Sequence, residues 1–337
     1  MKALDLDFLK SNAYNLRWAE LPDGVIPFTA ADWDLPSDKS IEEAITASIA
    51  HRGFPYGSGA GLPAFRKALA THFNEHKNTE ISANQTLACN SAAAAIQHLY
   101  NYLLKAGDEI LLPDPVDFLL AECAHRMNVR VVRFSQQKEG INLQDLQNKV
   151  TPNTKALVIC NPHNPNGYVL QKNDLQQLHA FCQTNSLQLI SDEVWSDIVH
   201  YSAPFHSAAF LNLNTWVVYG FSKGFGLAGL RIGAIIAPSE DDIQKIMKHN
   251  GYDRTIEGAS TLSQQAAIAA MQYGWNNTLM LRQLFLENLE LAAKRINTET
   301  VCTCEAPSGT FVMSIRHPNH WNTELFCQYA LDTHKIA

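Results

Sequence analysis

Short apolar runs alternate with longer amphipathic stretches along most of this 337-residue chain. The apolar runs predict strands at residues 86–89, 109–112, 129–134, 156–160, 187–191, 215–220 and 233–237. The stretches between them have helical periodicity and predict helices at residues 92–105, 118–127, 143–150 and 172–184. Nearly continuous apolar strands are typical of a sheet that is buried on both faces. The alternation of strands and helices therefore predicts an α/β domain with a mostly parallel sheet.

The pattern changes after Pro238 and becomes helical, which predicts helices at residues 241–250, 261–273 and 276–297. A chain of this length has room for one large domain and a second, smaller one. We expect residues 46–245 to form the large domain. A small α+β domain would then combine residues 1–45 with residues 246–337.

Composition and charge narrow the classes of partner. Hydrophobic residues make up 46% of the chain and charged residues 18%, which is ordinary for a globular protein. The formal net charge of -7, with no Lys/Arg-rich run, disfavours nucleic acid as a partner. The most apolar long stretch, residues 224–238, is interrupted by Arg231 and is too short to span a membrane. We therefore expect neither nucleic acid nor a membrane as a partner.

The seven cysteines are scattered along the chain without a close framework. An odd number in this arrangement is typical of reduced thiols, so we expect a cytoplasmic protein. Cys302 and Cys304 are two residues apart and too isolated to indicate a metal site, so we expect no metal.

Polar residues follow four of the predicted strands at the point where each strand ends. They are Asn90-Ser91, the segment 161–167, Asp192-Glu193 and Ser222-Lys223. Ligands of open α/β sheets bind beyond the carboxyl ends of the strands. The four clusters therefore predict a binding site at one edge of the sheet.

Lys223 lies just past a predicted buried strand, in the Gly-rich segment 220–233. Desolvation and cationic neighbours would lower the pKa of an amine in such a place and make it a nucleophile. Arg231, eight residues further on, could hold a phosphate through a bidentate contact. A Ser-Lys pair on its own is more typical of a solvated loop, so this interpretation depends on the other clusters.

The other clusters each have a structural interpretation and a cofactor-binding one. Asp192 could cap a helix, or it could pair with a protonated pyridine nitrogen and so support a ring that acts as an electron sink. Asn164 could stabilise a turn, or it could donate its amide to a phenolic oxygen of the same ring. Ser91 and the amide of Ala92 could simply begin a helix, or they could bind a phosphate at its N-terminus.

The motifs around these residues, in this order along the chain, resemble the class I/II aminotransferase family of fold type I. The residues that carry the resemblance are Ser91, Asn164, Asp192, Lys223 and Arg231. The resemblance implies a pyridoxal 5′-phosphate (PLP) cofactor held as a Schiff base on Lys223. It also implies a seven-stranded, mainly parallel sheet and a homodimer whose active sites lie at the subunit interface.

The resemblance also implies roles for individual residues. The catalytic residues would be Lys223, as general base at the substrate α-carbon, and Asp192, as partner of the pyridinium. Ser222 would join Ser91 and Arg231 in binding the phosphate, and Tyr56 would reach the phosphate bound by the partner subunit.

Three hypotheses on function stay open at this stage. The first is aminotransfer on an L-amino acid of unknown identity. The second arises because residues 26–34 resemble the cystathionine β-lyase branch of the family, which breaks carbon–sulfur bonds with the same catalytic residues. The third is a protein that keeps the fold and binds a ligand without turnover.

Three positions depart from the family pattern inside the predicted site. Asp117 stands where an aromatic side chain normally stacks on the cofactor ring, and Phe118 could take over that role. Gly220 stands where a Ser or Thr normally contacts the phosphate, and Ser222 could compensate. Trp195 replaces a Tyr, and its indole N–H can still donate one hydrogen bond.

The fourth departure concerns the C-terminal part. In the family several dozen further residues follow, and one of them is the Arg that binds the substrate carboxylate. Either the sequence is a fragment, or the substrate carboxylate is held by other residues. Residues 329–337 resemble the start of the strand and loop before that Arg, so we expect a truncated sequence.

Overall fold

The computed structural model describes residues 5–11, 16–51, 53–137, 140–200, 204–319 and 322–337. Its centre is a seven-stranded sheet with the strand order β1-β9-β8-β7-β6-β2-β3. The strands are β1 (Thr86–Cys89), β2 (Glu109–Pro113), β3 (Arg130–Phe134), β6 (Thr154–Cys160), β7 (Gln188–Asp192), β8 (Thr215–Gly220) and β9 (Gly233–Ile236). β9 runs antiparallel to both of its neighbours, and every other pair in this sheet is parallel. The predicted α/β class with a mostly parallel sheet is confirmed.

Helices and a small hairpin surround the sheet. The helices before β6 are α1 (Leu6–Ser11), α2 (Leu16–Ala19), α3 (Lys39–Ala50), α4 (Pro63–His76), α5 (Ala92–Leu103), α6 (Phe118–His125) and α7 (Leu143–Lys149). The later helices are α8 (Lys172–Thr184), α9 (Glu240–Asn250), α10 (Thr261–Tyr273), α11 (Trp275–Glu299) and α12 (Thr323–His334). β4 (Gln136–Gln137) and β5 (Gly140–Ile141) pair as a separate two-stranded sheet.

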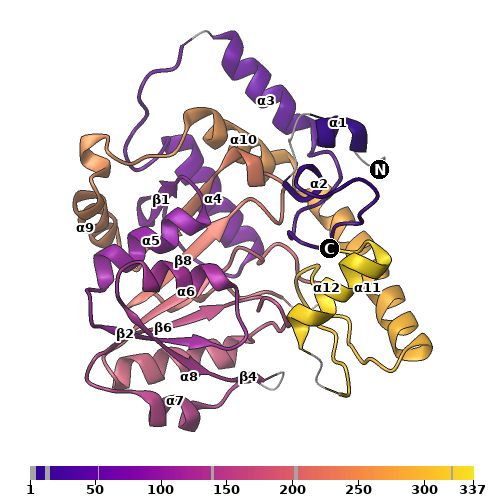
Figure 1. Ribbon diagram of the computed structural model, residues 1–337. Helices are drawn as coiled ribbons and strands as arrows, with labels where there is room; N and C mark the ends of the chain where they lie inside the picture. The colour runs from indigo at the N-terminus through magenta and orange to yellow at the C-terminus, as the bar shows by residue number, and fades with distance from the viewer. Residues whose placement is uncertain (1–4, 12–15, 52, 138–139, 201–203, 320–321) are drawn as a thin grey trace.

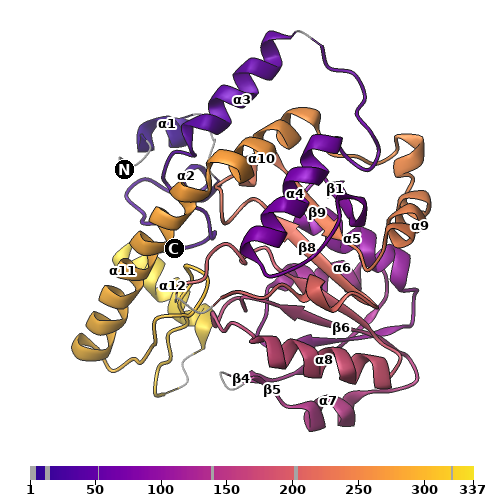
Figure 2. The same cartoon turned by 180° about the vertical axis from the view of Figure 1, so that it is seen from behind.

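Alternate side chains of the central strands enter two separate hydrophobic cores. In β8, Val217 packs in the core that contains Phe65 and Leu69 of α4, whereas Val218 packs in the core that contains Ile96 of α5. Figures 1 and 2 show α5 and α6 on one side of the sheet and α4 and α8 on the other. Burial on both faces is the reason why these strands are almost continuously apolar.

The C-terminal residues lie beside the N-terminal segment (Figure 1). Ile336 forms a parallel bridge with Ile26, and the amide of Phe28 donates a hydrogen bond to the carbonyl of Ala337. The expectation that residues 329–337 begin a strand is wrong for most of that range, because α12 continues to His334. The Asn322 side chain caps α12 by accepting from the amide of Leu325, and extended pairing starts only after the helix ends.

Candidate active site

The polar clusters predicted at strand ends do lie along one edge of the sheet. β6, β7 and β8 are parallel, and β1 has the same direction as β8 because both are antiparallel to β9. Their carboxyl ends therefore share an edge with Gly233, the first residue of β9. Gly233 is also packed against the start of α5, since a Cβ on it would lie 2.6 Å from the backbone nitrogen of Ala92. The topology thus brings Ser91, Asp192, Lys223 and the neighbourhood of Arg231 to one edge.

Lys223 is partly buried, and its amine has specific neighbours. Its Nζ donates a hydrogen bond to the carbonyl of Ala31 and lies 5.2 Å from the centroid of the Trp195 ring. Burial lowers the pKa of Lys223 from its usual value, although the carboxylates of Asp32, Asp117 and Asp192 act in the opposite direction. A lowered pKa increases the neutral fraction of the amine, which is the nucleophilic form.

Asp192 ends β7 with its side chain buried at 5% exposure. Its Oδ1 accepts a hydrogen bond of 3.1 Å from the amide of Val194. Burial raises the pKa of Asp192 to about 7, and Asp117 contributes in the same direction, while the Val194 amide and the Lys223 amine oppose the rise. A buried carboxylate of this kind gains stability from a cationic partner.

Trp195 provides an observation that favours a bound ring. Its side chain is 1% exposed, and its Nε1 has no hydrogen-bond partner among the described residues. Buried indole N–H groups normally have an acceptor. The ring packs edge-on against Phe311 at a centroid distance of 4.8 Å. A polar cofactor atom near Lys223 would satisfy this donor, so the residues present fit the predicted cofactor.

Asp117 contacts the segment 161–167 through Asn164. Oδ2 of Asp117 accepts a 3.2 Å hydrogen bond from Nδ2 of Asn164, and Oδ1 caps α6 by accepting from the amide of Leu119. Phe118 is 74% exposed. The predicted stacking role of Phe118 remains a prediction, and the amide of Asn164 is engaged by a carboxylate in this structure.

Of the predicted phosphate-binding residues, Ser91 begins α5, and the segment with Ser222 and Arg231 is bounded by Gly220 and Gly233, which both pack against Ala92. Ser91 is 6% exposed, and its Oγ accepts a 3.1 Å hydrogen bond from the amide of Ala94, so the hydroxyl caps the helix. Ser222 is partly buried and Arg231 is exposed. Arg231 has the left-handed backbone conformation, with φ of 49°, directly before β9. A helix N-terminus is suited to an anion, and a guanidinium can bind one through a bidentate contact.

Steric crowding explains why position 220 is Gly in this chain and not the Ser or Thr of the family pattern. A Cβ at this position would lie 2.8 Å from Cγ2 of Val194 and 3.1 Å from Cβ of Ala92.

We predict that Gly220→Ser lowers the free energy of unfolding by ~1–3 kcal/mol because the side chain would overpack this junction. Chemical denaturation would measure the change. Gly229→Ala is the matched control, since a Cβ there meets nothing within 4 Å.

A second variant tests whether Val194 is the cause. Adding Val194→Ala to Gly220→Ser removes the nearest atom and should restore part of the lost stability. A Gly220→Ser protein as stable as the unsubstituted one would contradict the steric explanation.

The sequence reasoning did not include several residues that lie close to the Lys223 amine. Ala31 accepts its hydrogen bond, and Asp32 is the first of the carboxylates that raise its pKa. Both belong to the segment 26–34, whose resemblance to one branch of the family was the available signal. Asp117 was noted as a departure, but the sequence did not indicate that its charge faces Lys223 and Asp192.

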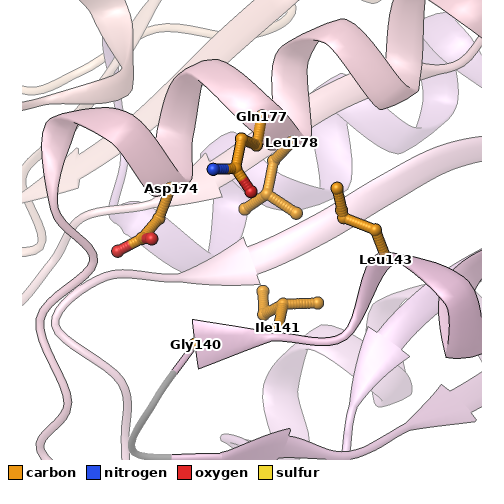
Figure 3. A pocket seen from close by; sticks show the side chains of 6 residues that line it. All are labelled: Gly140, Ile141, Leu143, Asp174, Gln177 and Leu178. Atoms are coloured by element: carbon orange, nitrogen blue, oxygen red, sulfur yellow. The ribbon is translucent and has the colours of Figure 1, made fainter.

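Two surface hollows contain neither Lys223 nor Asp192. The larger, of about 380 Å³, is lined by residues 55–59 on one side and by Tyr252 and residues 255–261 on the other. Tyr56, predicted to reach a partner subunit, is 89% exposed there. The smaller, of about 80 Å³, lies between β5 and α8 and contains none of the predicted site residues (Figure 3).

Among the described residues no helix has the length and apolar character that a membrane crossing needs. No group of three or more His, Cys, Asp or Glu side chains in the same part of the chain is arranged to hold a metal ion.

Comparison with known proteins identifies the class. Residues 23–337 match the family described as aminotransferase class I and II. The aspartate aminotransferase of Pyrococcus abyssi is 31% identical over 291 residues, which cover 83% of this chain and 73% of that protein. The crystal structure of an aromatic aminotransferase from Pyrococcus horikoshii OT3 superposes with a TM-score of 0.86 at 26% identity, covering 94% of this chain and 86% of that one.

This chain belongs to the class I and II aminotransferases. It is a PLP-dependent aminotransferase with the fold type I architecture. The hypothesis of a non-enzymatic protein is thereby set aside.

Cystalysin from Treponema denticola, which contains PLP, superposes with a TM-score of 0.89 at 17% identity over 97% of this chain and 87% of that one. At this identity the likeness shows the fold alone, and relatives named as aminotransferases do not favour the β-lyase hypothesis.

Proposed function

We propose that this protein transfers the amino group of an L-amino acid to a 2-oxo acid and that Lys223 carries the cofactor covalently. The observation that supports this most directly is the placement of the Lys223 amine. It lies over Trp195 at the edge of the sheet where Asp192 ends β7. A single amine of lowered pKa next to a buried carboxylate suits both attachment of an aldehyde and proton transfer.

Each residue near the ring position would have one role. When bound, the cofactor supplies an electron-withdrawing ring that stabilises negative charge at the α-carbon of the substrate. Asp192 would hold the ring nitrogen in its protonated form, and the Nε1–H of Trp195 would donate to a polar atom of the cofactor. Asn164 would turn its amide from Asp117 to the ring oxygen. Once released, the amine of Lys223 would take and return the proton at the α-carbon.

The phosphate would lie at the N-terminus of α5. The backbone amide of Ala92, the Ser91 and Ser222 hydroxyls and the Arg231 guanidinium would bind it. The proximity of Gly233 to Ala92 supports this, because it places the Arg231 segment beside the helix terminus.

An amino-exchange assay tests the proposed reaction. The purified protein with added PLP would be incubated with single L-amino acids and a 2-oxo acid, and the new amino acid would be measured. We expect product only when both substrates are present. Release of pyruvate and free thiol from cystathionine, without any need for an oxo acid, would overturn aminotransfer in favour of β-elimination.

We further propose that the protein is a homodimer in which Tyr56 enters the site of the partner subunit. Phe54, Tyr56 and Ile256 are 63%, 89% and 71% exposed, and Tyr56 and Ile256 line the larger hollow. Exposed aromatic and aliphatic side chains around a hollow are typical of surfaces that a second chain covers.

The cysteines are all free, which supports the proposal of a reducing, cytoplasmic location.

Mixed dimers test the shared site. We predict that the Lys223→Ala and Tyr56→Ala variants are each weakly active, and that the purified heterodimer of the two regains about half of the unsubstituted activity. The reason is that one of its two sites contains both Lys223 and Tyr56. Co-expression with two affinity tags would supply the heterodimer. A heterodimer no more active than its parents would contradict a site built from both subunits.

A further inference from the structure

A cluster of four buried polar side chains lies behind the Lys223 loop. We call it the Asp197 cluster, and it consists of Asp197, Lys77, His72 and Tyr219. Oδ1 of Asp197 accepts hydrogen bonds from Nζ of Lys77 at 2.6 Å and from Nε2 of His72 at 3.2 Å. Oδ2 accepts a 2.6 Å hydrogen bond from the hydroxyl of Tyr219. Each of the four residues is at most 2% exposed.

The charges of the cluster are balanced internally. Burial by itself would raise the pKa of Asp197, but Lys77 and His72 outweigh that effect and hold the pKa below its usual range. Burial lowers the pKa of His72, although the hydrogen bond to Asp197 opposes the shift, and the lower pKa favours the neutral form of this ring. The cluster is therefore one buried carboxylate–ammonium pair with two neutral donors. Such a pair contributes little net stability compared with apolar residues of the same volume, so the stability of the fold does not account for it.

The cluster touches the backbone next to Lys223. A Cβ on Gly224 would lie 2.5 Å from both Cβ and Oδ2 of Asp197, so the Gly224 backbone rests directly on that side chain. Oγ1 of Thr278 in α11 also donates a 2.8 Å hydrogen bond to the carbonyl of Gly224. Gly224 is therefore contacted by two elements, and Lys223 precedes it by one peptide bond.

The cluster also ties together the elements that carry the site. Tyr219 belongs to β8, the strand that leads into Lys223, and Asp197 follows β7, the strand that ends in Asp192. His72 and Lys77 come from α4 and its C-terminus. The rings of Phe73, Phe205 and Tyr219 surround the Lys77 ammonium at 5.4–5.5 Å.

We propose that Asp197, fixed by Lys77, His72 and Tyr219, is a positioning residue that sets the place of the Lys223 amine through the backbone of Gly224. The inference rests on the proposed role of Lys223 as the residue that carries the cofactor. A misplacement of about 1 Å in a reacting group can cost roughly 100-fold in rate. The arrangement would keep the amine at the Ala31 carbonyl and over Trp195.

The first experiment measures covalent attachment rather than activity. Cofactor-free protein would be mixed with PLP and quenched with borohydride at set times, and the modified Lys223 peptide would be counted by mass spectrometry. We expect Tyr219→Phe, which removes one donor to Asp197 and keeps the ring, to slow attachment by roughly tenfold. Gly224→Ala, which would push the backbone off Asp197, should slow it further.

Two further variants separate positioning from folding. Trp216→Phe, also on β8, removes a partly buried 2.9 Å hydrogen bond to Gln188 at the other end of the strand. We expect it to lower the unfolding temperature about as much as Tyr219→Phe while attachment stays within about twofold of the unsubstituted rate. Lys77→Met combined with Asp197→Asn removes both charges without leaving one unpaired, and it should slow attachment as Tyr219→Phe does.

The pH dependence of Lys223 acylation is a further measurement, and it would not change if the role of the Asp197 cluster were purely structural. The charged groups facing Lys223 are Asp32 from the N-terminal segment, Asp117 from the start of α6 and Asp192 from β7. All three remain in every variant. We expect the pH of half-maximal acylation of Lys223 in cofactor-free Tyr219→Phe protein to rise by about half a unit, because a less fixed amine is better hydrated.

The outcomes are distinguishable. If the unsubstituted protein gains no adduct at Lys223, the proposed function fails, and this inference fails with it. If the adduct forms normally and Tyr219→Phe attaches the cofactor as fast as Trp216→Phe does, with an unchanged acylation profile, only the positioning role is overturned.

Discussion

Lys223→Ala should abolish covalent attachment of the cofactor and reduce kcat by about 10⁴-fold. The substitution removes the amine that forms the bond, and it also removes the base that moves the α-proton. Borohydride treatment followed by peptide mass spectrometry would measure attachment, and the amino-exchange assay would measure kcat. The unfolding temperature should change little, because Lys223 is only partly buried and its amine bonds to a single carbonyl. The loss of activity would therefore not reflect unfolding.

Two variants give this prediction its controls. Lys155→Ala removes a lysine whose amine hydrogen-bonds the Pro152 carbonyl at the surface, and it should change neither readout. Lys223→Arg keeps a cation beside Trp195 but provides no free amine, so it should be as inactive as Lys223→Ala. An adduct that persists in Lys223→Ala would show that another lysine carries the cofactor.

Asp192→Asn should reduce kcat by about 10²–10³-fold, because a neutral amide cannot hold the ring nitrogen in its charged form. The amide keeps the size of the side chain and can still accept from the Val194 amide. Glu193→Gln is the matched control. Glu193 is also fully buried and burial raises its pKa to about 7, but its Oε1 accepts from the Ala208 amide and the Ser191 hydroxyl. It should therefore lose little activity.

The same substitution should stabilise the cofactor-free protein at alkaline pH. Burial raises the pKa of Asp192 from 3.8 to about 7, so the folded state binds a proton that the unfolded state has lost. The contribution of this group to stability is fully present below pH 3.8 and is lost as the pH rises through about 7. At pH 8 the neutral amide of the Asp192→Asn variant avoids that loss, and we expect a gain of ~1–4 kcal/mol in the free energy of unfolding.

Urea denaturation at several pH values would test whether Asp192→Asn raises the free energy of unfolding at alkaline pH. The stability difference between Asp192→Asn and the unsubstituted protein should be small near pH 4 and should grow to its full size above pH 7. A difference that is constant across this range would show that Asp192 titrates with an ordinary pKa in the folded state. Saturating cofactor should reduce the gain, since the cofactor would provide the missing positive partner.

The strands of the central sheet were predictable because their residues are apolar at nearly every position. The predictions for residues 86–89 and 215–220 coincide with β1 and β8. The antiparallel direction of β9 was not predictable, since a strand buried on both faces has the same composition in either direction. The division into two domains remains a prediction.

The four α-helices that the structure describes before β1 were not predicted, although two of them, α3 and α4, have signals in the sequence. Asp38 caps α3, and α4 begins with Pro63. The apolar periodicity of α4 is weak because its inner surface includes His72 and ends at Lys77, both buried. A pattern of hydrophobic and polar positions assigns such residues to the solvent side. Their partner, Asp197, lies more than 100 residues away in the sequence.

The sequence by itself determined the class of protein, because Asn164, Asp192, Lys223 and their motifs follow strands whose ends must meet at one edge. Local patterns carry that information. Only the tertiary structure decided what surrounds the Lys223 amine. The carbonyl of Ala31, 192 residues away along the chain, accepts its hydrogen bond, and the carboxylates of Asp32 and Asp117 oppose the effect of burial on its pKa. Such contacts depend on how distant segments pack, and distance in space, unlike strand and helix periodicity, has no signature within a short stretch of sequence.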